Sequence, residues 1–268
     1  MKLDYWYKQT LDKPISPELI WSQPENRQLA GKLIIIGGNL HGFAAPAEAY
    51  IQAVKAGIGI ARVVIPDSIK TLLEHSQGND LGMEFAPSTP SGSFSLNALA
   101  EILSLCGWAD GVLLAGDFGR NSETAILLER LITKYCGQLT LSNDTIDYFI
   151  NNLALILQRP NTTLVLNLLQ LQKLFMQAHQ ATPITSDMDL IRLVKVIHDF
   201  TLTYPVNFVI NHAKYILVAV NGQVSSTVTS QSTDIKQGIL AAQTAIWWLQ
   251  NPNKIFEAIS CGILIGSK

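Results

Sequence analysis

A glycine cluster near the start of the chain, IIIGGNLHGFAAP, is the first segment whose residue types could bind a ligand. It lies between a short apolar run that predicts a strand and a pattern that predicts a helix, and open α/β folds bind ligands at such positions. The cluster does not match GxGxxG, and no lysine follows Gly42 as a Walker phosphate loop requires. A tight turn without ligand contact is an equal alternative, in which His41 only makes hydrogen bonds within the loop.

A second cluster, LLAGDFGRNSET, could hold an anion. Gly116 and Gly119 follow a predicted strand, and Asn121 or Ser122 is expected to cap the next helix. Unpaired amides at such a helix start bind anions, and Arg120 could add a charge-assisted contact. Ordinary capping with a solvated Arg120 is the alternative interpretation.

The third cluster, TSQSTDIKQGILAAQTAIWWL, leads from a polar stretch into a long predicted helix. Asp234 at the helix start could act as a general base near the positive end of the helix dipole. The alternative is an acidic residue that only stabilises its helix. Trp247 and Trp248 are interpreted as core or interface aromatics.

The elements that must position these clusters alternate between strand and helix. Strands are predicted at 33–36, 58–65, 111–115, 138–141, 162–166 and 208–210, and helices at 46–56, 96–106, 122–135, 144–151, 169–178 and 188–203. This alternation predicts a parallel sheet covered by helices on both faces.

The two ends of the chain depart from this pattern. Residues 215–220 and 223–229 predict a β-hairpin, because Asn221-Gly222 suits a type I′ turn, and two helices at about 234–250 and 253–265 are expected to follow. Residues 1–31 contain three prolines and little periodicity, which predicts an irregular N-terminal extension. The remaining residues, 32–268, are predicted to form one α/β domain.

The charge balance excludes some partners. The 268 residues include 19 Lys and Arg against 21 Asp and Glu, so no basic field gathers nucleic acid or anionic membrane. Only 15% of the residues are charged, below the roughly 25% that is usual in soluble domains, which predicts a homo-oligomer. The polar start MKLDYWYK and the interrupted apolar stretches predict a cytoplasmic protein without a membrane segment.

Other catalytic and metal motifs are not present in the sequence. The five histidines form no HExxH, and there is no GxSxG elbow. The three cysteines are far apart and form no CxxC, so neither a disulfide framework nor a zinc site is expected.

Taken in order, the clusters resemble the ribokinase-like superfamily, most closely its NAD(P)H-hydrate dehydratase branch. In that branch a GG-containing loop ending in Gly-Ala precedes a helix and an AGAGL turn. This sequence has Gly37-Gly38, Ala44-Ala45 and AGIGI at 56–60 with the same spacing. The resemblance covers nearly all of residues 32–268 and implies a three-layer αβα fold.

Two further motifs align in the middle of the chain. The family's GPGLGR is similar to AGDFGR at 115–120, and its DAD segment is similar to Ser142-Asn143-Asp144. The family's PHPGE aligns with residues 166–170, so that Asn167 replaces the histidine. Its LKG strand end aligns with residues 210–212, where the lysine and the glycine are lost.

The closing family motif is GxGD with a glycine four residues later. In the family its amides surround the transferring phosphate, and the Asp takes a proton from the substrate hydroxyl. The matching residues are Gln231, Ser232, Thr233, Asp234 and Gly238. The acid is therefore retained, whereas both glycines before it are lost.

The resemblance implies a set of site residues for this chain. Asp234 is expected to be catalytic; the expected substrate contacts are Gly38, Asn39, Ala45, Gly119, Asp144 and Asn167, and the expected nucleotide contacts are Arg120, Asn211, Thr233 and Gly238. The implied cofactors are ATP or ADP with Mg²⁺, and the implied activity is repair of hydrated NADH or NADPH. The alternatives are a catalytically inactive nucleotide-binding or structural homo-oligomeric relative, and a kinase of another small alcohol.

Overall fold

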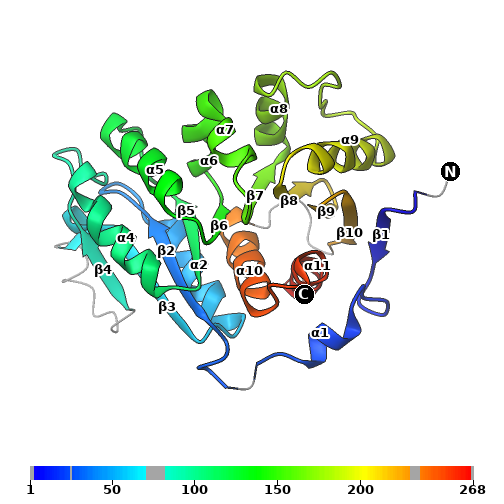
Figure 1. The fold of residues 1–268 in the computed structure, drawn as a ribbon, viewed down its shortest axis with the longest axis horizontal. Coiled ribbons are helices and arrows are strands. Elements are labelled where there is room, and N and C mark those ends of the chain that lie inside the picture. The colour runs from blue at the N-terminus through cyan, green and yellow to red at the C-terminus, as the bar shows by residue number, and fades with distance from the viewer. Residues whose placement is uncertain (1–2, 25, 71–81, 230–235, 267–268) are drawn as a thin grey trace.

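A ten-stranded sheet forms the centre of the computed structural model, which describes residues 3–24, 26–70, 82–229 and 236–266 (Figure 1). The strand order is β1-β10-β9-β8-β7-β6-β5-β2-β3-β4. The strands are β1 (Trp6–Gln9), β2 (Lys32–Gly37), β3 (Ile60–Pro66), β4 (Met83–Ala86), β5 (Gly111–Gly116), β6 (Gln138–Leu141), β7 (Thr162–Asn167), β8 (Val206–His212), β9 (Tyr215–Val220) and β10 (Gln223–Val228). The sheet from β4 to β8 is parallel throughout, as predicted.

Helices connect the parallel strands and cover the sheet. They are α1 (Pro17–Trp21), α2 (Ala44–Lys55), α4 (Leu99–Trp108), α5 (Ser122–Lys134), α6 (Thr145–Phe149), α7 (Ala154–Leu157), α8 (Leu168–Gln177), α9 (Leu190–Thr203), α10 (Gln237–Gln250) and α11 (Ile255–Gly266), with short 3-10 helices at Asp67–Ile69, Leu96–Ala98 and Ile150–Asn152. None of the helices in the described ranges combines the length and hydropathy of a membrane-crossing segment.

The alternation of apolar side chains along each strand produces two cores, one on each face of the sheet. On β2, Ile34 and Ile36 pack into a core shared with α4 to α9. Leu33 and Ile35 point to the opposite face, where they pack with α2, α10 and α11. Helices therefore lie on both faces, and the chain has the predicted three-layer αβα architecture (Figure 1).

The hairpin predicted near the C-terminus is present. Asn221 and Gly222 have φ angles of +47° and +79°, which the type I′ turn requires, and β9 pairs antiparallel with β10. The following helix α10 begins at Gln237, whereas the sequence predicted a start at Asp234. Thr233, Asp234 and the rest of residues 230–235 lie outside the described residues.

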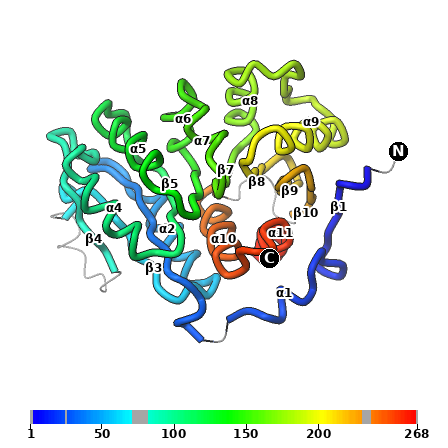
Figure 2. The backbone as a smooth tube through the Cα atoms, in the orientation of Figure 1, coloured from blue at the N-terminus to red at the C-terminus, as the bar shows by residue number. Residues whose placement is uncertain are grey.

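The N-terminal segment is more regular than the sequence indicated. Residues 6–9 form β1, which pairs parallel with β10 at the edge of the sheet, and Trp6 Nε1 donates to Ser226 Oγ at 3.0 Å. Leu19 of α1 packs in a cluster with Ala258 of α11. Figure 2 follows this segment past α11 to β2. A strand of four residues has too short a pattern to be recognised without its partner, so the expectation of an irregular segment was wrong here.

A further strand and a further α-helix were not predicted. Strand β4 extends the sheet beyond β3 through four residues, MEFA, and helix α7 is a single turn within the apolar stretch LALILQ. Both are shorter than the windows over which periodicity distinguishes a strand from a helix. Neither element contributes a residue to the pockets described below.

Candidate functional site

The carboxyl ends of β2 and β5 meet where the strand order reverses, which is the usual ligand position in open α/β sheets. Gly38 N donates to Gly116 O at 2.9 Å. A Cβ atom on Gly37 would lie 2.4 Å from that same oxygen, so the two strand ends approach closely only because Gly37 has no side chain. The first two glycine clusters are therefore packed directly against each other.

The loop after β2 is held by the side chain of Asn39. Its Nδ2 atom donates to Asp117 O at 2.6 Å, and its Oδ1 atom accepts from His41 N at 2.8 Å. The predicted site residues Gly38 and Asn39 therefore build the loop and connect it to the loop after β5. His41 takes part in these contacts through its backbone amide.

A pocket of about 410 Å³ opens between the first turns of α2 and α10. Its lining residues come from four elements or loops: Ala44, Ala45, Glu48, Asp117, Asn143, Asp144, Lys236, Gln237 and Gly238. Three residues predicted from the resemblance, Ala45, Asp144 and Gly238, are thus brought together from positions far apart in the sequence. We call this space the α2–α10 pocket.

Asp117 connects the floor of the α2–α10 pocket to the start of α2. Its Oδ2 atom accepts a hydrogen bond of 2.8 Å from Ala45 N, one of the amides in the first turn of α2 that have no partner within the helix. Asp117 itself has a φ angle of +60°, which is uncommon for a residue other than glycine. The residue occupies the place of a glycine in the family pattern GPGLGR.

The carboxyl group of Asp144 is partly buried in the pocket. Its Oδ2 atom accepts from Phe118 N at 3.1 Å, and its Oδ1 atom is buried without a hydrogen-bond partner among the described residues. Burial raises the pKa of Asp144 to about 6, the nearby Asp117 carboxylate adds to the rise, and the backbone amides of Asp117 and Phe118 oppose it. A carboxyl group with this pKa can hold or release a proton near neutral pH.

The wall formed by α10 is fixed by polar contacts to neighbouring elements. Lys236 forms an ion pair with Glu48 of α2. Gln237 Nε2 donates to Gln170 Oε1 at 2.7 Å, and Gln170 Nε2 donates to Asn143 O at 2.7 Å. The start of α10 is therefore tied to α2, to α8 and to the loop after β6.

Asn167 caps helix α8. Its Oδ1 atom accepts from Gln170 N at 2.9 Å, and Gln170 Oε1 accepts from Asn167 N at 3.2 Å, which completes a capping box. Asn211 lies opposite Asn167 in the register of β7 and β8. Neither asparagine lines the α2–α10 pocket.

An adjoining pocket of about 630 Å³ shares Asp144 with the α2–α10 pocket. Its lining includes the predicted residues Gly119 and Arg120, and Lys173 lies there 3.2 Å from Asp147. Within the described ranges no carboxylate forms an ion pair with Arg120.

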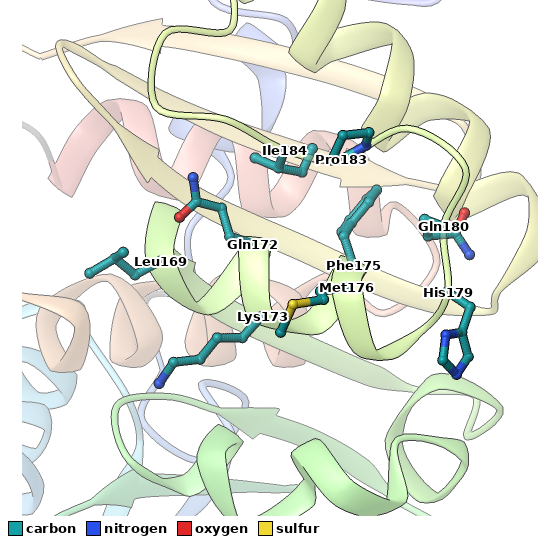
Figure 3. Close-up of a pocket in the computed structure, with 9 residues that line it drawn as sticks. All are labelled: Leu169, Gln172, Lys173, Phe175, Met176, His179, Gln180, Pro183 and Ile184. Carbon is teal, nitrogen blue, oxygen red and sulfur yellow. The ribbon is translucent and has the colours of Figure 1, made fainter.

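A further hollow of about 590 Å³ lies along α8 and the loop that follows it (Figure 3). Its lining is largely apolar and includes Leu169, Met176 and Ile184. Lys173 borders both this hollow and the adjoining pocket. None of the residues predicted from the sequence lines the hollow.

Several pocket residues were not selected from the sequence. Asp117 and Asn143 lie inside the aligned motifs, and their positive φ angles of +60° and +53° mark them as special only once the backbone is known. Glu48, Lys236 and Gln237 belong to helix starts that carry no recognisable motif. The signal available for Asp117 was the replacement of a family glycine by an acid.

Comparisons with known proteins agree with the fold. No protein-family model matches the chain. A ribokinase-like superfamily protein from Enterococcus faecalis V583 superposes with a TM-score of 0.74 at 14% identity, over 100% of this chain and 88% of that one. The ADP/ATP-dependent NAD(P)H-hydrate dehydratase of Bacillus subtilis, co-crystallised with ATP and Mg²⁺, gives a TM-score of 0.61 at 9% identity, over 95% of this chain and 87% of that one.

A curated relative is similar over part of the sequence. The bifunctional NAD(P)H-hydrate repair enzyme Nnr of Methanothermobacter thermautotrophicus is 34% identical over 102 residues, which is 38% of this chain. The match spans 19% of the length of that enzyme. Together with the strand order, these similarities show that the chain has the ribokinase-like fold, as the sequence motifs predicted.

Proposed function

We propose that the chain is an ADP- or ATP-dependent dehydratase of hydrated NADH or NADPH, with the α2–α10 pocket as its substrate site. One observation carries the proposal. Ala45, Asp144 and Gly238 belong to three separate motifs of the family resemblance, and all three line one pocket at the carboxyl edge of the sheet. The similarity to the two NAD(P)H-hydrate enzymes supports this choice of reaction.

The proposed chemistry places the reacting hydroxyl beside the start of α10. Asp234, four residues before Gly238, would take the proton of that hydroxyl while a phosphoryl group passes from the nucleotide to the hydroxyl oxygen. Elimination of this phosphate, together with loss of a proton from the neighbouring ring carbon, then restores the double bond of the reduced nicotinamide. The first amides of α10 and the positive end of its dipole would stabilise the transferring phosphate, since they lie at the pocket wall.

Mg²⁺ would neutralise phosphate charge in such a reaction. Within the described residues no three His, Cys, Asp or Glu side chains gather as a metal site. The pocket carboxylates of Glu48, Asp117 and Asp144 contact Lys236, Ala45 N and Phe118 N respectively. These residues do not form a magnesium site, so we assign the metal no ligand and derive no step through it.

The proposal is tested by incubating the purified protein with hydrated NADH, Mg²⁺ and either ATP or ADP. We expect the absorbance of reduced nicotinamide to return, and we expect Asp234→Asn to slow this recovery by about 100- to 10,000-fold because the general base is lost. The donor that supports recovery identifies the co-substrate. No recovery with either donor, from folded protein, contradicts a dehydratase.

A second candidate is a binding protein of the same fold without catalysis. It is favoured by the loss of both motif glycines at Gln231 and Thr233 and by the carboxylates that already occupy Ala45 N and Lys236. For this candidate, Asp234→Asn leaves nucleotide and dinucleotide affinity unchanged, and wild type shows no turnover. A homo-oligomeric state and a cytoplasmic location stay predictions for either candidate.

A further inference from the structure

The carboxylate of Asp117 lies in the α2–α10 pocket at a backbone position that suits glycine. Its φ angle is +60°, and the aligned family pattern GPGLGR has a glycine there. A glycine would leave Ala45 N without this side-chain acceptor and would leave the space beside it open. The acid therefore changes both the charge and the shape of the pocket.

Two groups of the pocket that could attract a phosphate, Ala45 N and the Lys236 ammonium, are already paired with carboxylates of this chain. Ala45 N donates to Asp117 Oδ2 at 2.8 Å, and Lys236 is paired with Glu48. Asp144 lines the same pocket as Asp117. Among the described lining residues, three carboxyl groups thus face a single cationic side chain.

Asp147 also acts on the carboxyl group of Asp144. It lines the adjoining pocket, forms an ion pair with Lys173 at 3.2 Å, and raises the pKa of Asp144 further. A phosphate placed at the start of α2 would meet these negative charges and would compete with Asp117 for the amide. A hydroxyl or an amide N–H would instead find acceptors, because an ionised carboxylate can only accept hydrogen bonds.

We propose that Asp117 is a specificity-determining residue, which makes the α2–α10 pocket select a neutral group with hydroxyl or amide donors and reject a phosphate at the start of α2. The proposal rests on the proposed function, since it takes this pocket as the ligand site. It assigns the phosphates of a dinucleotide to positions away from Ala45 N.

Two substitutions of Asp117 separate charge from shape. Asp117→Asn keeps an oxygen that can accept from Ala45 N, whereas Asp117→Gly removes the side chain. Both residues tolerate a positive φ angle, so both variants are expected to fold. Asp110→Asn is the matched control, because Asp110 Oδ2 also accepts a hydrogen bond from a backbone amide, that of Lys32, at 2.9 Å. Asp110 lies just before β5, whereas Asp117 lies just after it.

The test uses two probes that differ by one phosphate, reduced nicotinamide riboside and its 5′-phosphate. Affinities are measured by titration calorimetry with the full chain and without a phosphate donor. Wild type is expected to bind the riboside at least as tightly as the phosphate. Both Asp117 variants are expected to shift this preference toward the phosphate by about tenfold or more, and added salt should reduce the shift. Asp110→Asn should leave the preference unchanged.

The proposal is overturned if the ratio of riboside affinity to phosphate affinity in Asp117→Asn lies within about twofold of the wild-type ratio. Removal of a negative charge next to a bound phosphate should change this ratio by more than that. Failure of both probes to bind any of the proteins also overturns the proposal. Either result is distinct from failure of the proposed reaction, which is read from Asp234-dependent recovery of NADH and not from the preference between these probes.

Discussion

The carboxylate of Asp117 accepts a hydrogen bond of 2.8 Å from the backbone amide of Ala45, across 72 residues of sequence. This contact joins the loop after β5 to the first turn of α2. It also places a negative charge where an anionic ligand would otherwise find an unpaired helix amide. The shape and the charge of the α2–α10 pocket therefore depend on an acid at position 117 of the AGDFGR segment.

We predict that Gly116→Ala lowers the free energy of unfolding by about 3 kcal/mol. The new methyl group has no room, and the backbone φ angle at this position is one that alanine rarely adopts. The φ angle of Gly116 is +110°, and a Cβ atom there would lie 2.6 Å from Asn143 Cβ and 2.9 Å from Asp144 Oδ1. Urea unfolding measures the change. Gly107→Ala is the control, since nothing lies within 4 Å of its Cβ position in α4, and it should be neutral or stabilise by up to about 1 kcal/mol. Equal effects of the two substitutions would contradict the prediction.

We predict that Asp144→Asn removes a pH dependence of stability. The folded pKa of Asp144 is raised to about 6 from an ordinary value of 3.8. The folded state therefore binds the proton more tightly than the unfolded state, and this group destabilises the protein as pH rises from about 4 to 6.

Between pH 5 and pH 8, the wild type should lose about 1 kcal/mol of stability through Asp144. The Asp144→Asn variant should not show this loss, so its stability relative to wild type should improve at pH 8. Urea titrations of both proteins at the two pH values measure the difference. The same stability difference between the proteins at both pH values would show that Asp144 does not titrate in this range.

We predict that Gln170→Leu lowers the free energy of unfolding by about 2 to 3 kcal/mol. Its side chain donates to Asn143 O and accepts from Gln237 Nε2 and Asn167 N, so a leucine leaves all three groups without this partner. Thermal or urea unfolding tests the change. Gln177→Leu on the exposed side of the same helix should lie within about 0.5 kcal/mol of wild type. A similarly small effect at Gln170 would mean that this network contributes little.

Much of the fold could be predicted from the sequence because most strands are buried on both faces. The run LIII of β2 and the run VLLA of β5 contain no polar residue. Such continuous apolar runs are typical of central parallel strands, whereas half-exposed strands alternate apolar and polar residues. Asn221-Gly222 fixed the position of the hairpin. The edge strands β1 and β4 have four residues each, and their pairing depends on the finished sheet.

The site was only partly predictable for a different reason. Ala45, Asp144 and Gly238 could be aligned with family motifs, and all three line the pocket. The role of Asp117 depends on a positive φ angle and on a contact between distant segments. The place of Lys236 in the pocket depends on the packing of α10 against α2. Such tertiary relationships leave no local pattern in the sequence.

The proposed ligand site is tested most directly by a substitution at the start of α10 that fills the α2–α10 pocket. The quantity measured is the affinity for NADH. A Cβ atom on Gly238 would lie 3.4 Å from Ala45 O, so a β-branched side chain there would occupy the space between the two helices. We predict that Gly238→Val weakens NADH binding by at least about tenfold, while Gly107→Val in α4 leaves the affinity unchanged. Thermal unfolding confirms that both variants are folded. Wild-type affinity in folded Gly238→Val protein would show that the ligand binds elsewhere and would contradict the proposed site.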